Sequence, residues 1–164
     1  MKHWWKIIIG IVVVAAFVWL FRLLITPQPG VTVEDQGRQH ISQEQVATTS
    51  GNPPTSGSHL STWVKAGVYS ESQQDGELIH SLEHGYVIIS YKCEEGCETL
   101  IKQLTDLANR KKQWKLIVVP RPQLDTTIAL TAWDRIDTFD KFDAKRIEAF
   151  IDYFRDHGPE KTMD

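Results

Sequence analysis

The sequence predicts an α+β domain, or a small α/β domain, in which two helices cover a mixed β-sheet. A nearly continuous apolar run at residues 86–91 is typical of a buried central strand. Apolar residues recur with helical spacing over residues 98–110 and 143–157, which predicts two amphipathic helices. Two runs rich in β-forming residues, 114–119 and 128–133, predict strands and complete the order β-α-β-β-α. One N-terminal transmembrane helix and a loop-rich segment precede this core.

The first 25 residues predict the transmembrane helix. The 22 residues from Trp4 to Ile25 are apolar except for Lys6 and Arg22. As a helix they span about 33 Å, enough to cross a bilayer core. No small-residue cleavage site follows, as it would in a signal peptide, so we expect the segment to remain as an anchor. The lysines before it predict a single-pass protein of the bacterial cytoplasmic membrane, with its C-terminal domain outside or in the periplasm.

The remaining sequence divides by composition. Residues 26–50 are polar and contain proline and glycine, so we predict a tether with one short strand at residues 31–33. Residues 51–160 are expected to form a single extracytoplasmic domain. The part after residue 25 contains 15 basic and 21 acidic residues, with no basic stripe. This charge excludes a nucleic-acid partner, and the only partner that the sequence indicates is the membrane itself.

Three histidines are the strongest candidates for chemistry. His80 and His84 lie four residues apart in a predicted helix at residues 77–84, so their imidazoles project from the same face. His59 ends a rigid, turn-rich segment that we expect to fold over this helix. Three imidazoles suit copper or zinc and leave a coordination position open. We predict that these three residues are metal ligands. Glu83 would orient one of the three histidines without binding the metal itself.

Two alternatives are kept open. In the first, the domain is a non-enzymatic envelope interaction or assembly module whose histidines only lock a loop. In the second, His80–His84 is the H-x-x-E-H signature of a zinc-dependent hydrolase, with Glu83 as general base and Glu160 as third ligand. Gly85 and a strand follow where such an enzyme continues its helix, and the domain is short for a substrate chamber. The remaining histidines receive no role: His3, His40 and His157.

Cys93 and Cys97 follow the first predicted strand and open a helix. Outside the cytoplasm, two cysteines this close most often form an inert disulfide. The alternative is a pair of metal-binding or redox thiols, because a helix N-terminus lowers the pKa of a thiol. The C-x3-C spacing after a strand resembles copper-delivering thioredoxin-like proteins, but the predicted elements lack the extra helix and strand of that fold.

Four aspartates recur every three residues between positions 134 and 143. They lack the glycine turn and the terminal glutamate of a calcium-binding loop. We therefore interpret them as exposed loop residues, with the last of them capping a helix.

Five short motifs are spread over the folded part of the chain. They are Pro53-Pro54-Thr55-Ser56-Gly57 leading to His59, Gly67-Val68-Tyr69, His80-Ser81-Leu82-Glu83-His84-Gly85, Ala132-Trp133 and Gly158-Pro159-Glu160. Together they resemble the bacterial family called domain of unknown function 3105, over about residues 50–160. The resemblance implies one N-terminal membrane helix and supplies no activity. Because its motifs cluster on histidines, it favours the metal interpretation.

Overall fold

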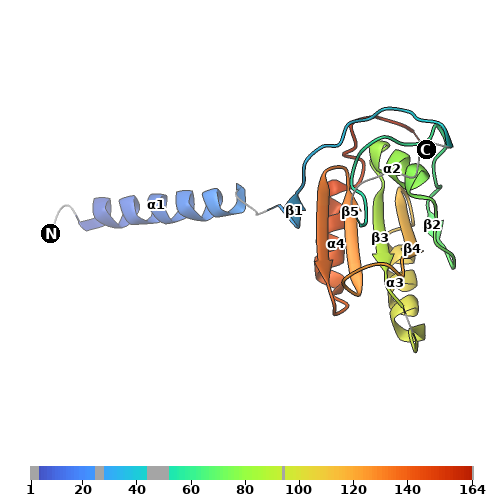
Figure 1. The fold of residues 1–164 in the computed structure, drawn as a ribbon. Helices are drawn as coiled ribbons and strands as arrows, with labels where there is room; N and C mark the ends of the chain where they lie inside the picture. The colour runs from blue at the N-terminus through green and yellow to red at the C-terminus, as the bar shows by residue number, and fades with distance from the viewer. Residues whose placement is uncertain (1–3, 25–27, 44–51, 94, 164) are drawn as a thin grey trace.

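The structure confirms an α+β fold built on a mixed sheet. It is a computed structural model that describes residues 4–24, 28–43, 52–93 and 95–163. The helices are α1 (Trp4–Leu24), α2 (Asp75–Glu83), α3 (Glu98–Arg110) and α4 (Ala144–Phe154). The strands are β1 (Val31–Thr32), β2 (Gly67–Val68), β3 (Val87–Tyr91), β4 (Leu116–Pro120), β5 (Ile128–Ala132) and β6 (Arg135–Phe139). They form one sheet in the order β1-β6-β5-β3-β4-β2 (Figure 1).

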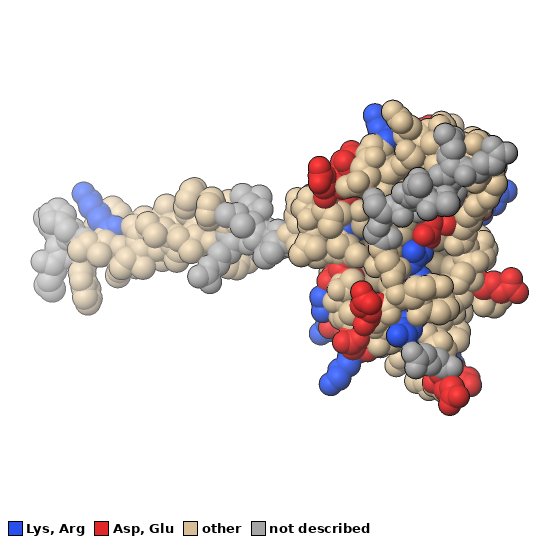
Figure 2. Space-filling model, in the orientation of Figure 1, with Lys and Arg blue, Asp and Glu red and all other residues tan. Residues whose placement is uncertain are grey.

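The N-terminal helix α1 is long and apolar enough to cross a membrane. Its most apolar stretch, Trp4–Phe21, has a mean hydropathy of 2.3, and none of it is buried against the rest of the chain. Figure 1 shows α1 apart from the sheet. In Figure 2, α1 is almost free of charge, whereas residues of both signs are distributed over the folded part. The predicted domain boundaries next to residues 25 and 50 lie outside the described residues.

The sheet lies between two helical layers, and β3 is at its centre. Successive residues of β3 face opposite sides. Ile89 packs in a core cluster with residues of α3 and α4, whereas Ile88 packs in a second cluster with Leu78 and Leu82 of α2. β3 is parallel to β4 and antiparallel to β5. Helix α2 thus covers the second face, and its C-terminal end leads directly into the start of β3.

Strand β6 was not predicted, and our interpretation of Asp137 as an exposed loop residue is wrong. β6 pairs antiparallel with β5, and Asp137 in its middle is 8 % exposed. The Arg146 side chain of α4 donates to this carboxylate, with Nε 2.8 Å from Oδ2. An acidic residue at an inward position interrupts the apolar alternation that identifies a strand, and only the arginine of a distant helix makes it tolerable. Asp143 caps α4 as expected by accepting from the Arg146 N–H.

The predicted tether contacts the folded part along residues 31–41. β1 pairs with β6 at the edge of the sheet. Further along, the N–H of His59 donates to Gln39 O at 3.0 Å, and the N–H of Ile41 donates to His59 O at 2.8 Å. His40 and His59 therefore face each other in an isolated parallel bridge. We call residues 36–41 the strap, because they hold the loop that carries His59.

Cys93 and Cys97 form a disulfide in the connection between β3 and α3. Cys97 is also the N-cap residue of α3.

Asp134, in the turn between β5 and β6, is expected to destabilise the fold at neutral pH. Burial raises the pKa of its carboxyl, and nearby Asp35 raises the pKa further against the opposing effects of Ser56 and Arg135. A carboxyl whose pKa is raised by folding contributes full stability below its unfolded pKa, about 3.9, and loses it as the pH rises. We expect Asp134→Asn to increase the free energy of unfolding at pH 7 by up to about 1 kcal/mol. Asparagine also tolerates the positive φ of 58° at this position.

Urea unfolding at pH 7 and pH 3.5 checks this expectation. The advantage of Asp134→Asn should become much smaller at the lower pH, where the wild-type carboxyl is mostly protonated in both states. The exposed Asp125→Asn is the control and should equal wild type at both values. A variant that is less stable than wild type at pH 7 would contradict the expectation.

Candidate metal centre

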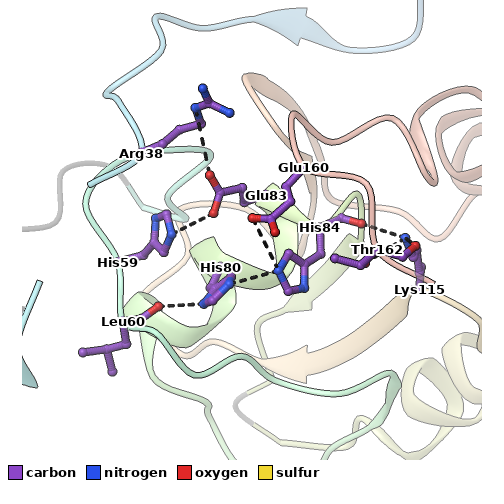
Figure 3. A network of polar contacts seen from close by, with 9 residues as sticks. All are labelled: Arg38, His59, Leu60, His80, Glu83, His84, Lys115, Glu160 and Thr162. Carbon is purple, nitrogen blue, oxygen red and sulfur yellow. Dashed lines mark hydrogen bonds and ion pairs between the residues drawn. The ribbon is translucent and has the colours of Figure 1, made fainter. Parts of the chain in front are cut away.

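Four segments that are distant in the sequence meet beside the C-terminal end of α2. They are the strap, the loop that ends at His59, α2 itself and the C-terminal segment around Glu160. Figure 3 shows the side chains of His59, His80, Glu83 and His84 converging there, with Glu160 beside His84. Nearly all of this cluster is removed from solvent, since the relative exposures of these four converging residues range from 0 % to 5 %.

His59 presents one ring nitrogen to the cluster. Its Nδ1–H donates to Gly57 O at 2.8 Å, so the neutral ring carries its lone pair on Nε2. That Nε2 lies 2.9 Å from Oε2 of Glu83. Neither atom has a hydrogen-bond partner within the described part of the chain, although both are buried. Two buried acceptors that face each other repel unless a proton on the imidazole or a metal ion lies between them.

His80 is held in the same tautomer as His59. Its Nδ1–H donates to Leu60 O at 2.7 Å, which leaves the lone pair on Nε2, and this nitrogen is hydrogen-bonded to His84. Burial lowers the pKa of His80; the bond to Leu60 opposes this shift, and the neighbouring histidines 84, 59 and 40 lower the pKa further. The imidazole is therefore neutral at physiological pH and has its lone pair available to a metal ion. Its Nε2 lies 3.0 Å from Nε2 of His84.

Glu83 is oriented by a cation from the strap. Arg38 Nε lies 4.0 Å from Oε1 of Glu83, on the carboxylate oxygen that does not face His59. Glu83 is 4 % exposed at the last position of α2. We predicted that Glu83 orients a ligating histidine. Its Oε2 faces the ring of His59, a position from which it could orient that ring or bind an ion itself.

His40 joins the cluster, although we expected no role for it. Its ring centroid lies 4.8 Å from that of His59 and 5.2 Å from that of His80. It comes from a polar segment without periodicity, so no local pattern marks it. Only the backbone pairing of the strap with the His59 loop brings it here. His40 could therefore be predicted as a member of the cluster only if this backbone pairing were already known.

The side chains form two overlapping groups that could hold a metal ion. The inner group is His40, His59, His80 and Glu83, and the outer group is His80, His84 and Glu160. Within each group, the potential ligand atoms all lie within 4.8 Å of one another. The predicted set of His59, His80 and His84 is thus divided between the two groups, and His80 belongs to both. Of the histidines to which we assigned no role, His157 is in neither group, and residue 3 lies outside the described residues.

The sequence that contains this cluster matches one known protein family. The family described as "Protein of unknown function (DUF3105)" matches residues 40–164. The chain belongs to this family. The DUF3105 match begins at His40 and contains all the side chains of both groups. No curated protein and no solved structure matches the chain.

The C-terminal segment of the DUF3105 domain places Glu160. The N–H of Glu160 donates to Glu83 O at 3.0 Å, and Oε2 of Glu160 lies 3.9 Å from Nε2 of His84. Gly158 permits this approach, because a Cβ atom there would lie 2.2 Å from Glu83 O. The buried Lys115 secures the segment, with Nζ donating to His84 O at 2.9 Å and to Thr162 O at 2.9 Å.

Trp63 lies over the outer group of the DUF3105 cluster. Its ring centroid is 5.0 Å from that of His84 and 5.6 Å from that of His80. Since the residue is 38 % exposed, it shields these two imidazoles from water without sealing them. Outside α1 it is one of the few large exposed apolar residues in the described part of the chain.

Proposed function

We propose that this protein is a membrane-anchored metal-binding protein whose inner group holds one copper or zinc ion. The observation that carries the proposal is the approach of two buried lone-pair atoms, His59 Nε2 and Glu83 Oε2, without a hydrogen bond. A divalent ion beside both atoms would remove their repulsion. Three imidazoles and one carboxylate are a donor set that suits zinc and copper better than magnesium or calcium.

The surroundings support a bound ion rather than a set of structural histidines. His59 Nδ1 is bonded to Gly57 O, and its Nε2 lies 2.9 Å from a carboxylate oxygen, a donor type that zinc also takes. Backbone carbonyls fix the tautomers of His59 and His80, and Arg38 fixes the orientation of Glu83. Outer partners of this kind are typical of metal ligands.

We further propose that α1 anchors the domain as a single-pass helix in a bacterial cytoplasmic membrane. The basic residues on its N-terminal side, Lys2 and Lys6, favour a cytoplasmic N-terminus and an extracytoplasmic or periplasmic domain. In that location the cluster would be accessible to metal ions on the extracytoplasmic side of the membrane. A cytoplasmic location of the domain, shown by reporter fusions, would contradict this part of the proposal.

Metal titration of the full chain in detergent tests the function. We expect the metal-free protein to bind Cu²⁺ or Zn²⁺ with a Kd below 10 μM, which corresponds to about −7 kcal/mol or better. His59→Asn keeps a donor near Gly57 O but removes Nε2, so it should weaken binding more than tenfold. His157→Ala removes an exposed histidine outside both groups and should bind like wild type. If wild type binds neither ion, or His59→Asn binds equally well, the inner group is not a metal site.

A further inference from the structure

We propose that the outer group is a second position for the same ion, through which the ion enters and leaves the inner group. This inference rests on the proposed metal site. It concerns His84 and Glu160, which that site does not use. The two positions share His80, so they are occupied in turn and the domain holds one ion at a time.

The chemistry of His80 is the first step of the argument. Its Nδ1 carries the proton that is donated to Leu60 O, and a carbonyl in the fold holds it there. Only Nε2 has a lone pair for a metal ion, and one imidazole lone pair binds one ion. Nε2 lies 3.0 Å from Nε2 of His84 and belongs to both groups.

The side chains of the two groups favour one ion over a paired-metal centre. A carboxylate that bridges two ions would have to belong to both groups. Glu83 belongs to the inner group alone and Glu160 to the outer group alone. Among the described residues, His80 is the only member of both groups, and its single free nitrogen cannot bridge.

The two positions differ in donor number and in exposure. The inner group offers four ligands and includes a glutamate side chain that is 6 % exposed. The outer group offers three, and its glutamate side chain is 52 % exposed. The ion should therefore reside in the inner group, because more ligands hold it there. The outer group is open to a donor or acceptor of metal in solution.

The cluster is a continuous series of ligands with exposed ends. Ring centroids are 5.0 Å apart between His59 and His80 and 4.4 Å apart between His80 and His84. His40 at one end and Glu160 at the other are exposed, and the three imidazoles between them are buried. An ion that moves from the outer to the inner group exchanges His84 and Glu160 for His40, His59 and Glu83 while it keeps His80. Each position supplies one carboxylate, so the local charge is the same before and after.

The experiment measures stoichiometry, affinity and exchange rate on the full chain in detergent, with Zn²⁺ as the probe. Elemental analysis should find one zinc per chain. Stopped-flow transfer of zinc to a chromophoric chelator should slow at least tenfold in Glu160→Gln and in His84→Asn, while Kd changes less than tenfold. His59→Asn should show the opposite pattern, a Kd weakened more than tenfold. His157→Ala is the matched control.

Each other outcome overturns the inference. Two zinc ions per chain would indicate a paired-metal centre. An equal loss of affinity in His84→Asn and His59→Asn would indicate one combined site. An unchanged exchange rate in Glu160→Gln and His84→Asn would place these residues outside the path of the ion. Failure of wild type to bind zinc or copper at all would instead refute the proposed function, so the two failures are distinguishable.

Discussion

His80→Asn is expected to lower the affinity for Cu²⁺ or Zn²⁺ by at least 100-fold, or about 2.7 kcal/mol. His80 belongs to both ligand groups, so neither position can compensate for its loss. Losing an outer partner of a metal ligand typically costs 10- to 100-fold, and losing a shared ligand should cost more. Isothermal titration of the metal-free full chain in detergent measures the change.

Asparagine is the informative substitution at this position. Its side-chain amide lies near the position of Nδ1 and can still donate to Leu60 O, while nothing replaces Nε2. The metal-free variant should therefore unfold at nearly the same urea concentration as metal-free wild type. A variant that binds metal like wild type would contradict the prediction, and so would one whose lost affinity is explained by unfolding.

Lys115→Met is expected to lower the free energy of unfolding by about 2–3 kcal/mol. The Lys115 side chain is fully buried, and its Nζ donates to His84 O, Asp156 Oδ1 and Thr162 O at 2.8–2.9 Å. Methionine fills similar volume without a donor, so these acceptors lose their partner. Because the same bonds hold the C-terminal segment beside α2, we also expect Glu160 to move away from His84.

Urea unfolding and limited proteolysis of the C-terminal segment check both parts. Lys111→Met is the matched control, since Lys111 pairs with Asp152, whose side chain is 56 % exposed, and such a pair contributes at most about 1 kcal/mol. The pKa of Asp156 is lowered mainly by its hydrogen bond to Lys115. That part of the stability is present above the unfolded pKa and is lost as the pH falls through the lowered value. If Lys115→Met and Lys111→Met are equally stable, the buried amine does not hold the segment.

Much of the fold is local enough to be predicted from the sequence. Residues 86–91 are apolar on both faces because β3 is buried by helices on both sides, and this produces a continuous run. The apolar spacing in α3 and α4 reflects one buried face on each helix. The proximity of His80 and His84 follows from helical geometry, and the proximity of Cys93 and Cys97 from their short separation.

The remaining elements depend on contacts between distant segments. β6 carries Asp137 toward the interior, which no period identifies, and Arg146 of α4 compensates its charge. β2 contains two residues, too few for any pattern, whereas β1 lies within the short strand expected at residues 31–33. Such short edge strands form only because a longer strand beside them offers free backbone groups.

The sequence by itself determined the apolar N-terminal helix, the mixed sheet with its helices, and the histidine pair at the end of α2. These features depend on apolar periodicity and on spacings of a few residues. The regular geometry of a helix or strand then determines which of these residues share a face. Only the tertiary structure decided which residues make up the candidate metal centre. His40 and Glu160 lie 40 and 76 residues from His80 and His84, respectively. They reach the centre through backbone pairing of the strap with the His59 loop and through the close approach of Gly158 to Glu83. Chain entropy opposes such contacts, and only the packed core holds them in place.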